Sequence, residues 1–143
     1  MNLMDIDALL KEEKYDIYNN PSIKDEDIQK ISECILENIN IDLNKYFDLL
    51  KCNSKFCWFN FLKILEAFPD EDRVKGLPLL FELLQDSNWP TYKKTMELLE
   101  SMDKEMLFPH FKKYWYEANR DEDEMWLDNL RILGDRMGMV TEG

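Results

Sequence analysis

The residue types that most often carry enzyme chemistry are few in this chain and widely spaced. There is one histidine, His110, and there are three cysteines, Cys34, Cys52 and Cys57. General acid–base catalysis needs titratable groups held together in a dry pocket, and zinc sites usually combine two close pairs of ligands. His110 has no nucleophile in a recognisable setting, and Cys52 and Cys57 lack a second pair. We therefore predict that the protein is not an enzyme and has no catalytic residue, metal site or cofactor.

Three runs of acidic residues, 25–27, 70–72 and 121–124, are the other groups with the right chemistry for a cation. A calcium loop alternates its oxygen ligands and has a glycine at its sharp turn, and none of the runs follows that pattern. Each run lies where a helix is expected to begin, and carboxylates there interact favourably with the helix dipole. We interpret them as solvated groups at helix starts.

A compact turn, Asp86-Ser87-Asn88-Trp89-Pro90, is the segment best suited to recognising a partner. Tryptophan is enriched at binding hot spots, and Asp86 and Asn88 come shortly before Trp89, so the three side chains could contact a partner together. The alternative is structural, with Trp89 filling a gap between helix pairs while the polar side chains bond backbone groups. The structural interpretation is favoured, because Pro90 fixes the turn instead of freeing it.

The charge balance restricts the class of partner. Thirty acids against eighteen bases leave a net charge of −12, and the densest basic clusters are only the pairs Lys93-Lys94 and Lys112-Lys113. An acidic surface repels phosphate groups, so we predict neither a nucleic-acid nor a membrane partner. A basic protein would suit this charge, because complementary fields speed association. The acidity can also serve only to keep the protein in solution.

The cysteine count and the apolar pattern indicate a location. An odd number of cysteines without regular spacing is not a disulfide framework, which favours a reducing compartment. The first residues carry acids and no basic region, unlike a signal peptide, and no apolar run reaches the roughly 18 residues that a membrane span needs. We predict a cytoplasmic protein.

The elements that must position these residues are predicted to be helices. Only four glycines and five prolines occur, which favours long helices joined by short loops over a many-turned β-fold. Apolar residues recur at helical spacing along the chain. The expected helices cover roughly 3–13, 22–39, 42–50, 54–68, 78–84, 90–102, 109–120 and 121–137. The expected start and stop residues are Ser22, Asp42, Ser54, Asn88, the Asp121–Glu124 capping box, and Gly138.

The chain repeats itself at an offset of thirty-four residues. Phe47, Leu49 and Leu50 recur as Phe81, Leu83 and Leu84, and Ile64-Leu65 recur as Leu98-Leu99 and then as Ile132-Leu133. A lone helix pair cannot bury its apolar face, so repeated pairs must stack. The tetratricopeptide pattern is not met, whereas a proline opening or bending the first helix of a unit, as at Pro78 and Pro109, is typical of HEAT repeats.

We therefore predict an all-α fold: a short right-handed solenoid of antiparallel, HEAT-like helix pairs. About three repeat units cover 43–137, two atypical helices precede them in 1–42, and the whole chain 1–143 forms a single domain. The rival architecture is an irregular bundle in which the leucine matches arise by chance.

A resemblance supports this fold. The segment from Leu77 to Pro90 reads Leu-Pro-Leu-Leu-Phe-Glu-Leu-Leu-Gln-Asp-Ser-Asn-Trp-Pro, and Pro109 and Asp123-Glu124-Met125-Trp126 follow it. This order resembles an uncharacterised bacterial family with a HEAT-like fold and an Asp-x-Asn-Trp-Pro turn. The similarity covers roughly 43–136, and Thr91 departs from it where an aliphatic residue is expected. It implies the fold and no activity. The candidate binding residues are Asp86, Asn88, Trp89, Asp123 and Trp126.

Two functions remain as hypotheses. The first is a non-enzymatic protein–protein interaction module, in one version an inhibitor or immunity-type protein that blocks a basic toxin. The second is a DNA-handling protein, because some HEAT-like proteins are DNA glycosylases that grip a damaged duplex. That role needs a basic groove, and the net charge of −12 argues against it.

Overall fold

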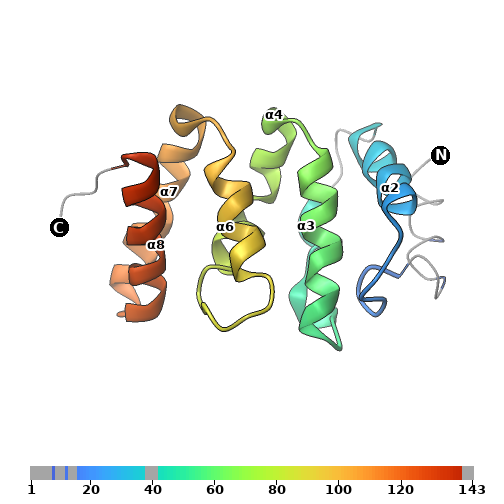
Figure 1. Cartoon of the computed structure of the whole chain (residues 1–143), viewed down its shortest axis with the longest axis horizontal. Coiled ribbons are helices and arrows are strands. Elements are labelled where there is room, and N and C mark those ends of the chain that lie inside the picture. The colour runs from blue at the N-terminus through green and yellow to red at the C-terminus, as the bar shows by residue number, and fades with distance from the viewer. Residues whose placement is uncertain (1–7, 9–11, 13–15, 38–41, 140–143) are drawn as a thin grey trace. The chain divides into compact units, whose positions relative to one another are not determined.

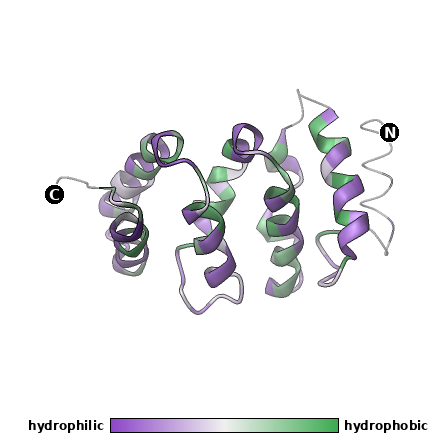
Figure 2. Ribbon diagram, turned by 45° about the horizontal axis from the view of Figure 1, so that its top comes forward, coloured by the Kyte–Doolittle hydropathy of each residue, from purple (hydrophilic) through white to green (hydrophobic). Residues whose placement is uncertain are grey.

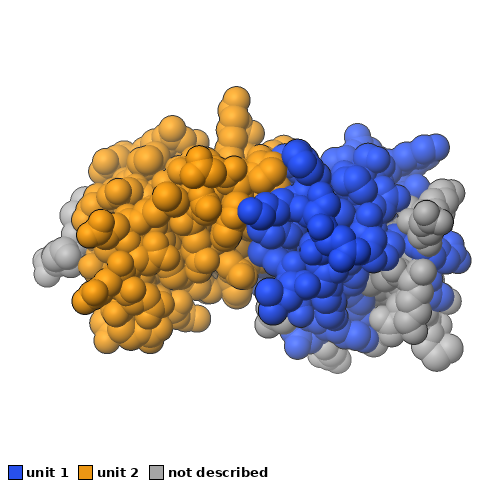
Figure 3. All heavy atoms as spheres, turned by 90° about the horizontal axis from the view of Figure 1, so that it is seen from below, with its two compact units in different colours: residues 1–76 blue, residues 77–143 orange. Residues whose placement is uncertain are grey.

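A computed structural model describes residues 8, 12, 16–37 and 42–139 of the chain. Its regular elements are α-helices and short 3-10 turns, and none of the described residues forms a strand, so the all-α prediction is confirmed. The chain divides into two compact units, unit 1 (1–76) and unit 2 (77–143), coloured separately in Figure 3. The predicted single domain stays a prediction. The helix expected over 3–13 lies outside the described residues, except for Ala8 and Glu12.

Two helices, α2 (Asp25–Glu37) and α3 (Trp58–Ala67), lie side by side in unit 1 (Figure 1). Polar and apolar residues alternate around α2, as expected of an amphipathic helix (Figure 2). The prediction that Ser22 caps α2 is wrong, because the first amide bonds of the helix go to the Lys24 carbonyl. The buried members of its apolar stripe are Ile28, Ile31 and Ile35.

The helix predicted over 42–50 does not form. The chain makes two 3-10 turns there, η1 (Leu43–Lys45) and η2 (Leu49–Lys51). The reason is Asp48, whose extended backbone interrupts the helical path and whose side chain accepts the Leu50 N–H at 3.0 Å. Aspartate competes with helix formation through such local bonds. One consequence is that Leu50, expected to be in the core, is 94% exposed.

The next boundaries follow the predictions. Ser54 Oγ accepts the Phe56 N–H at 3.2 Å and opens η3 (Lys55–Cys57), which runs directly into α3. Helix α3 ends at Ala67, and Phe68 before Pro69 is extended, as expected of a residue that precedes proline. The buried residues of α3 are Trp58, Asn60, Phe61, Leu62, Ile64 and Leu65.

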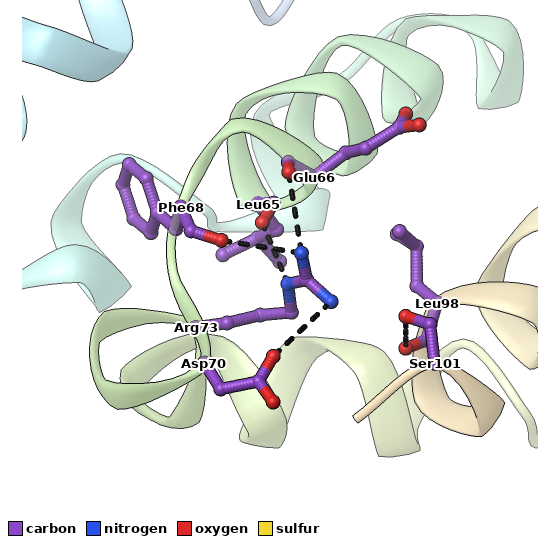
Figure 4. A network of polar contacts seen from close by, with 7 residues as sticks. All are labelled: Leu65, Glu66, Phe68, Asp70, Arg73, Leu98 and Ser101. Carbon is purple, nitrogen blue, oxygen red and sulfur yellow. Dashed lines mark hydrogen bonds and ion pairs between the residues drawn. The ribbon is translucent and has the colours of Figure 1, made fainter. Parts of the chain in front are cut away.

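A buried arginine closes the C-terminus of α3. Helix α4 (Asp70–Arg73) and the turn η4 (Val74–Gly76) follow Pro69, and α4 places Arg73 beneath the end of α3 (Figure 4). Its Nε donates to the Leu65 carbonyl at 2.9 Å, and its Nη2 donates to the carbonyls of Glu66 at 3.2 Å and Phe68 at 3.1 Å. The last carbonyls of a helix have no partner within it, so the guanidinium supplies donors there, beside the Phe68 N–H that also bonds the Leu65 carbonyl at 3.2 Å.

Unit 2 contains α5 (Leu77–Glu82), α6 (Tyr92–Glu100), α7 (Lys104–Arg120) and α8 (Glu124–Met137). Pro78 is the second residue of α5, where it was expected. Pro109 does not open a helix but lies inside α7, which begins after Asp103, whose side chain accepts the Met106 N–H. A proline inside a helix removes one bond, to the carbonyl four residues earlier, and α7 continues on both sides of that gap.

Helices α7 and α8 form an antiparallel pair joined by residues 121–123 (Figure 1). The predicted capping box is wrong, because Asp123, and not Asp121, is the N-cap of α8, and its side chain accepts the N–H of Trp126, the third residue of the helix, at 3.1 Å. Gly138 ends α8 as predicted, with a left-handed φ of 68°. Gly134 lets the pair approach closely, because a Cβ there would lie 3.1 Å from Phe111 Cζ and 2.9 Å from the Met139 carbonyl oxygen.

Candidate functional site

The Asp86–Pro90 turn is held by its own polar groups. Asp86 Oδ1 accepts the Asn88 N–H at 2.8 Å, and the Asp86 carbonyl accepts the Trp89 N–H at 3.2 Å. Asn88 is exposed and does not cap α6, and Pro90 lies outside that helix, because α6 begins only at Tyr92. Both of those sequence predictions are wrong. Hydrogen bonds within the turn include Pro90 in the turn, so the helix starts two residues later than predicted, at Tyr92.

Helix α8 holds the chain on either side of this turn. Trp126 Nε1 donates to the Phe81 carbonyl at 3.1 Å, and Asn129 Nδ2 donates to the Leu84 carbonyl at 2.7 Å. Tyr92 Oη, from the start of α6, donates to Asn129 Oδ1 at 3.2 Å. Both polar atoms of the Asn129 side chain therefore form hydrogen bonds, and these bonds connect α8 to the residues before and after the turn.

Trp126 is committed to packing. It is 5% exposed, and its ring centroid lies 6.1 Å from that of Tyr114, which in turn stacks on Phe81 at 4.6 Å. Asp123 is committed to capping α8. Of the five candidate residues, the structure thus joins Trp126 to the helix that leads into the turn, while the described contacts of the Asp123 side chain are to α8.

Two thiols of unit 1, those of Cys52 and Cys57, have raised pKa values. Cys34 and Cys57 are buried and Cys52 is half-buried, and all three are free. Burial raises the pKa of the Cys57 thiol and, with the nearby Cys57, raises the pKa of Cys52 to about 12. The thiolate is the reactive form, so a thiol with so high a pKa reacts slowly at neutral pH. Within the described ranges, no three His, Cys, Asp or Glu side chains come together as metal ligands.

Sequence reasoning missed a surface at the N-terminal end of α3. We call it the turn surface and define it by Lys45, Leu50, Lys51, Lys55 and Phe56, all exposed. Leu50 is 94% exposed and Phe56 is 59% exposed, the former in η2 and the latter in η3. The available signal was Asp48, a residue type that caps helices and turns, placed inside the predicted helix over 42–50.

Long-range bonds fix the backbone of the turn surface. Tyr18 Oη and Lys51 Nζ both donate to the Lys45 carbonyl, at 2.8 and 3.2 Å. Asn53 Nδ2 donates to Asn19 Oδ1 at 2.6 Å, which ties the link between η2 and η3 to the segment before α2. A tyrosine hydroxyl is protonated at neutral pH, and burial raises the pKa of Tyr18 further.

No family model, curated protein or solved structure matches the chain. No helix in the described part of the chain is long and apolar enough to cross a membrane.

Proposed function

We propose that this chain is a non-enzymatic, cytoplasmic module that binds a basic protein. The observation that carries the proposal is the distribution of charge. Residues 1–76 contain sixteen acids and ten bases, and residues 77–143 contain fourteen acids and eight bases. Each unit is therefore acidic by itself, and a basic partner would be attracted to either.

The position of the carboxylates supports this proposal. Asp25 and Glu26 at the start of α2 are exposed, as are Asp121, Glu122 and Glu124 around the α7–α8 turn. Carboxylates that stay in solvent can meet a partner's lysines and arginines without a large desolvation cost. Contacts of this kind raise the association rate and weaken as salt increases.

The proposal includes the HEAT-like solenoid of helix pairs as its scaffold. Three leucines at the predicted offset, Leu65, Leu99 and Leu133, are all 0% exposed, which supports equivalent packing of α3, α6 and α8. Nitroxide labels at positions 63, 97 and 131, in a chain with Cys52 replaced by Ser, test the arrangement. Two nearly equal successive separations by double electron–electron resonance are expected, and clearly unequal ones would indicate an irregular bundle.

The function is tested with proteins encoded beside its gene, because an inhibitor and its target are often made together. Each neighbouring product is co-expressed with the tagged chain and purified with it at low salt. A basic product should be retained and should dissociate at high salt. The control is the chain with Asp121, Glu122 and Glu124 changed to Asn and Gln, which should bind more weakly at low salt.

Two results would contradict the proposal. One is that no neighbouring product is retained, and the other is retention that is indifferent to salt and to the loss of the carboxylates. Heparin serves as a further control, since retention on it at physiological salt would favour a nucleic-acid role instead.

A further inference from the structure

The segment that leads into α2 is organised by its own hydrogen bonds. We call residues 16–22 the strap. The Asp16 side chain accepts the N–H groups of Tyr18 and Asn19, at 2.9 and 3.3 Å. The Asp16 carbonyl accepts the Asn20 N–H at 2.9 Å. Because these bonds lie within the strap and do not involve α3, the strap can keep its shape if it separates from that helix.

The strap covers one face of α3. Cys57, at the N-cap of the helix, Asn60 and Phe61 are spaced so that their side chains share that face, and each is 0% exposed. The Phe61 ring meets the Tyr18 ring of the strap edge-on, with 5.8 Å between the centroids. Burial raises the pKa of the Cys57 thiol, and the charge of Asp16 in the strap raises it further. Strap residues therefore lie next to both Cys57 and Phe61.

Asn60 is the buried attachment point of the strap. Its Nδ2 donates to the Ile17 carbonyl at 3.5 Å and to the Asn20 carbonyl. Within the described residues, no N–H or O–H group donates to Asn60 Oδ1. A buried acceptor without a donor raises the free energy of the closed arrangement, and separation of the strap gives water access to both polar atoms. One side chain therefore holds the strap closed and also carries a cost that opening removes.

The other polar attachments of the strap to the turns before α3 lie in solvent. Tyr18 Oη donates to the Lys45 carbonyl at 2.8 Å, and Asn53 Nδ2 donates to Asn19 Oδ1 at 2.6 Å. Both bonds are exposed, so water can replace either partner at little cost. Ile17 is the one strap residue in the core, at 0% exposure. Separation of the strap therefore exposes much less apolar surface than unfolding of unit 1.

We propose that the strap opens locally from α3 while the helices of unit 1 stay folded, and so covers or uncovers one face of α3. Ile23, the residue after the strap, stays in place because it is 2% exposed and its carbonyl accepts a bond from Lys63 Nζ at 3.4 Å. The strap turns about this point. In the open state Cys57 and Phe61 reach solvent, and both polar atoms of Asn60 can bond water. A segment with few buried contacts opens at a lower free energy than the whole unit.

Alkylation of Cys57 by iodoacetamide at pH 8 tests the opening, in the full chain carrying Cys52→Ser. Peptide mass spectrometry follows position 57, and circular dichroism follows global unfolding over the same range of urea concentrations. At low urea, Cys57 should react at least about tenfold faster than global unfolding allows. The rate should depend only weakly on urea there, because local opening exposes little surface.

Variants test the role of Asn60 in the closed state. Asn60→Asp keeps nearly the same shape but places a carboxylate against the two strap carbonyls, so it should speed the low-urea reaction of Cys57 at least about tenfold further. The matched control is Asn129→Asp, which removes a buried bond to the Leu84 carbonyl in unit 2. It should change the low-urea rate less than about twofold, because local opening in unit 1 does not involve that bond. Tyr18→Phe removes only an exposed bond and should also change the rate less than about twofold.

Three results would overturn the proposal. One is a Cys57 reaction that follows global unfolding at every urea concentration, a comparison that needs no change at Asn60. The second is an Asn60→Asp chain whose low-urea rate is unchanged, and the third is an equal increase in Asn129→Asp. None of these measurements involves the basic partner of the proposed function, so the two proposals fail separately.

Discussion

Leu50 and Leu84 lie thirty-four residues apart, the offset at which the sequence predicted a repeat, and have opposite environments. Leu84 is 0% exposed and Leu50 is 94% exposed. In unit 2 the backbone bonds continue from α5, with Leu83 N–H to the Leu79 carbonyl at 3.0 Å and Leu84 N–H to the Phe81 carbonyl at 3.1 Å. In unit 1 the Asp48 side chain takes the Leu50 N–H instead. The same apolar spacing therefore yields core or surface, depending on one capping residue.

The largest effect should come from the two leucines themselves. Leu84→Ala should lower the free energy of unfolding by about 3 kcal/mol, because it removes a buried side chain and leaves a cavity. Leu50→Ala should change it by less than about 0.5 kcal/mol, because the side chain is already in water. Urea denaturation followed by circular dichroism measures both. Similar losses in the two variants would refute the contrast.

The second comparison concerns how each unit ends a helix. Unit 1 closes α3 with the Arg73 guanidinium, and unit 2 closes α8 with left-handed Gly138. Arg73→Met should cost about 2 to 3 kcal/mol, because the buried Phe68 carbonyl loses the Arg73 donor and the Leu65 carbonyl keeps only the Phe68 N–H. Arg73→Lys should recover only part of this, since lysine lacks the planar fork. Gly138→Ala should cost about 1 kcal/mol through the positive φ. If the Arg73→Lys variant is as stable as the native protein, the positive charge and not the planar shape of the guanidinium stabilises the end of α3.

The third comparison concerns close approach at two glycines. Gly134→Ala should cost about 2 kcal/mol, because the new Cβ meets the Met139 carbonyl oxygen at 2.9 Å and the chain must shift. Gly76→Ala should cost less, about 1 kcal/mol, because the new atom meets the end of the Leu65 side chain, which can rotate. Thermal unfolding by calorimetry ranks the two. A larger loss in Gly76→Ala would mean that the Leu65 side chain cannot rotate away from the new methyl group.

The smallest effect should separate the two aspartate caps. Asp123→Ala should cost about 1 kcal/mol, because it uncaps α8, a helix of fourteen residues. Asp48→Ala should cost less than about 0.5 kcal/mol, because η2 has only three residues and buries none of them. Chemical denaturation of both variants at one pH measures the difference. An equally large loss at Asp48 would show that η2 supports more of unit 1 than its burial indicates.

Boundaries set by neighbouring residues could be predicted from the sequence. Ser54 opens a helical turn, Pro69 stops α3 at Ala67 and Gly138 ends α8, because each acts through the backbone within a few residues. Competing caps were predicted less well. The structure uses Asp123 instead of Asp121. An aspartate can cap a helix at either position, so only the path of the loop decides which of the two does so.

Bonds between distant residues could not be predicted. Asn60 donates to the carbonyls of Ile17 and Asn20, and Asn129 donates to that of Leu84. The position of an asparagine in a helix does not indicate which carbonyl, some forty residues away, its side chain will bond. Trp126, one of the candidate binding residues, is only 5% exposed, because a large apolar ring at a helical core position has few alternatives to burial.

The sequence by itself determined that the chain is helical, where several helices end, and that both halves are acidic. These properties follow from composition, spacing and local backbone chemistry. Only the tertiary structure decided that Arg73 closes α3 and that α8 holds the residues flanking the Asp86–Pro90 turn. The physical reason is that burial and long-range hydrogen bonds depend on which segments meet in space, and residue type alone does not specify that meeting.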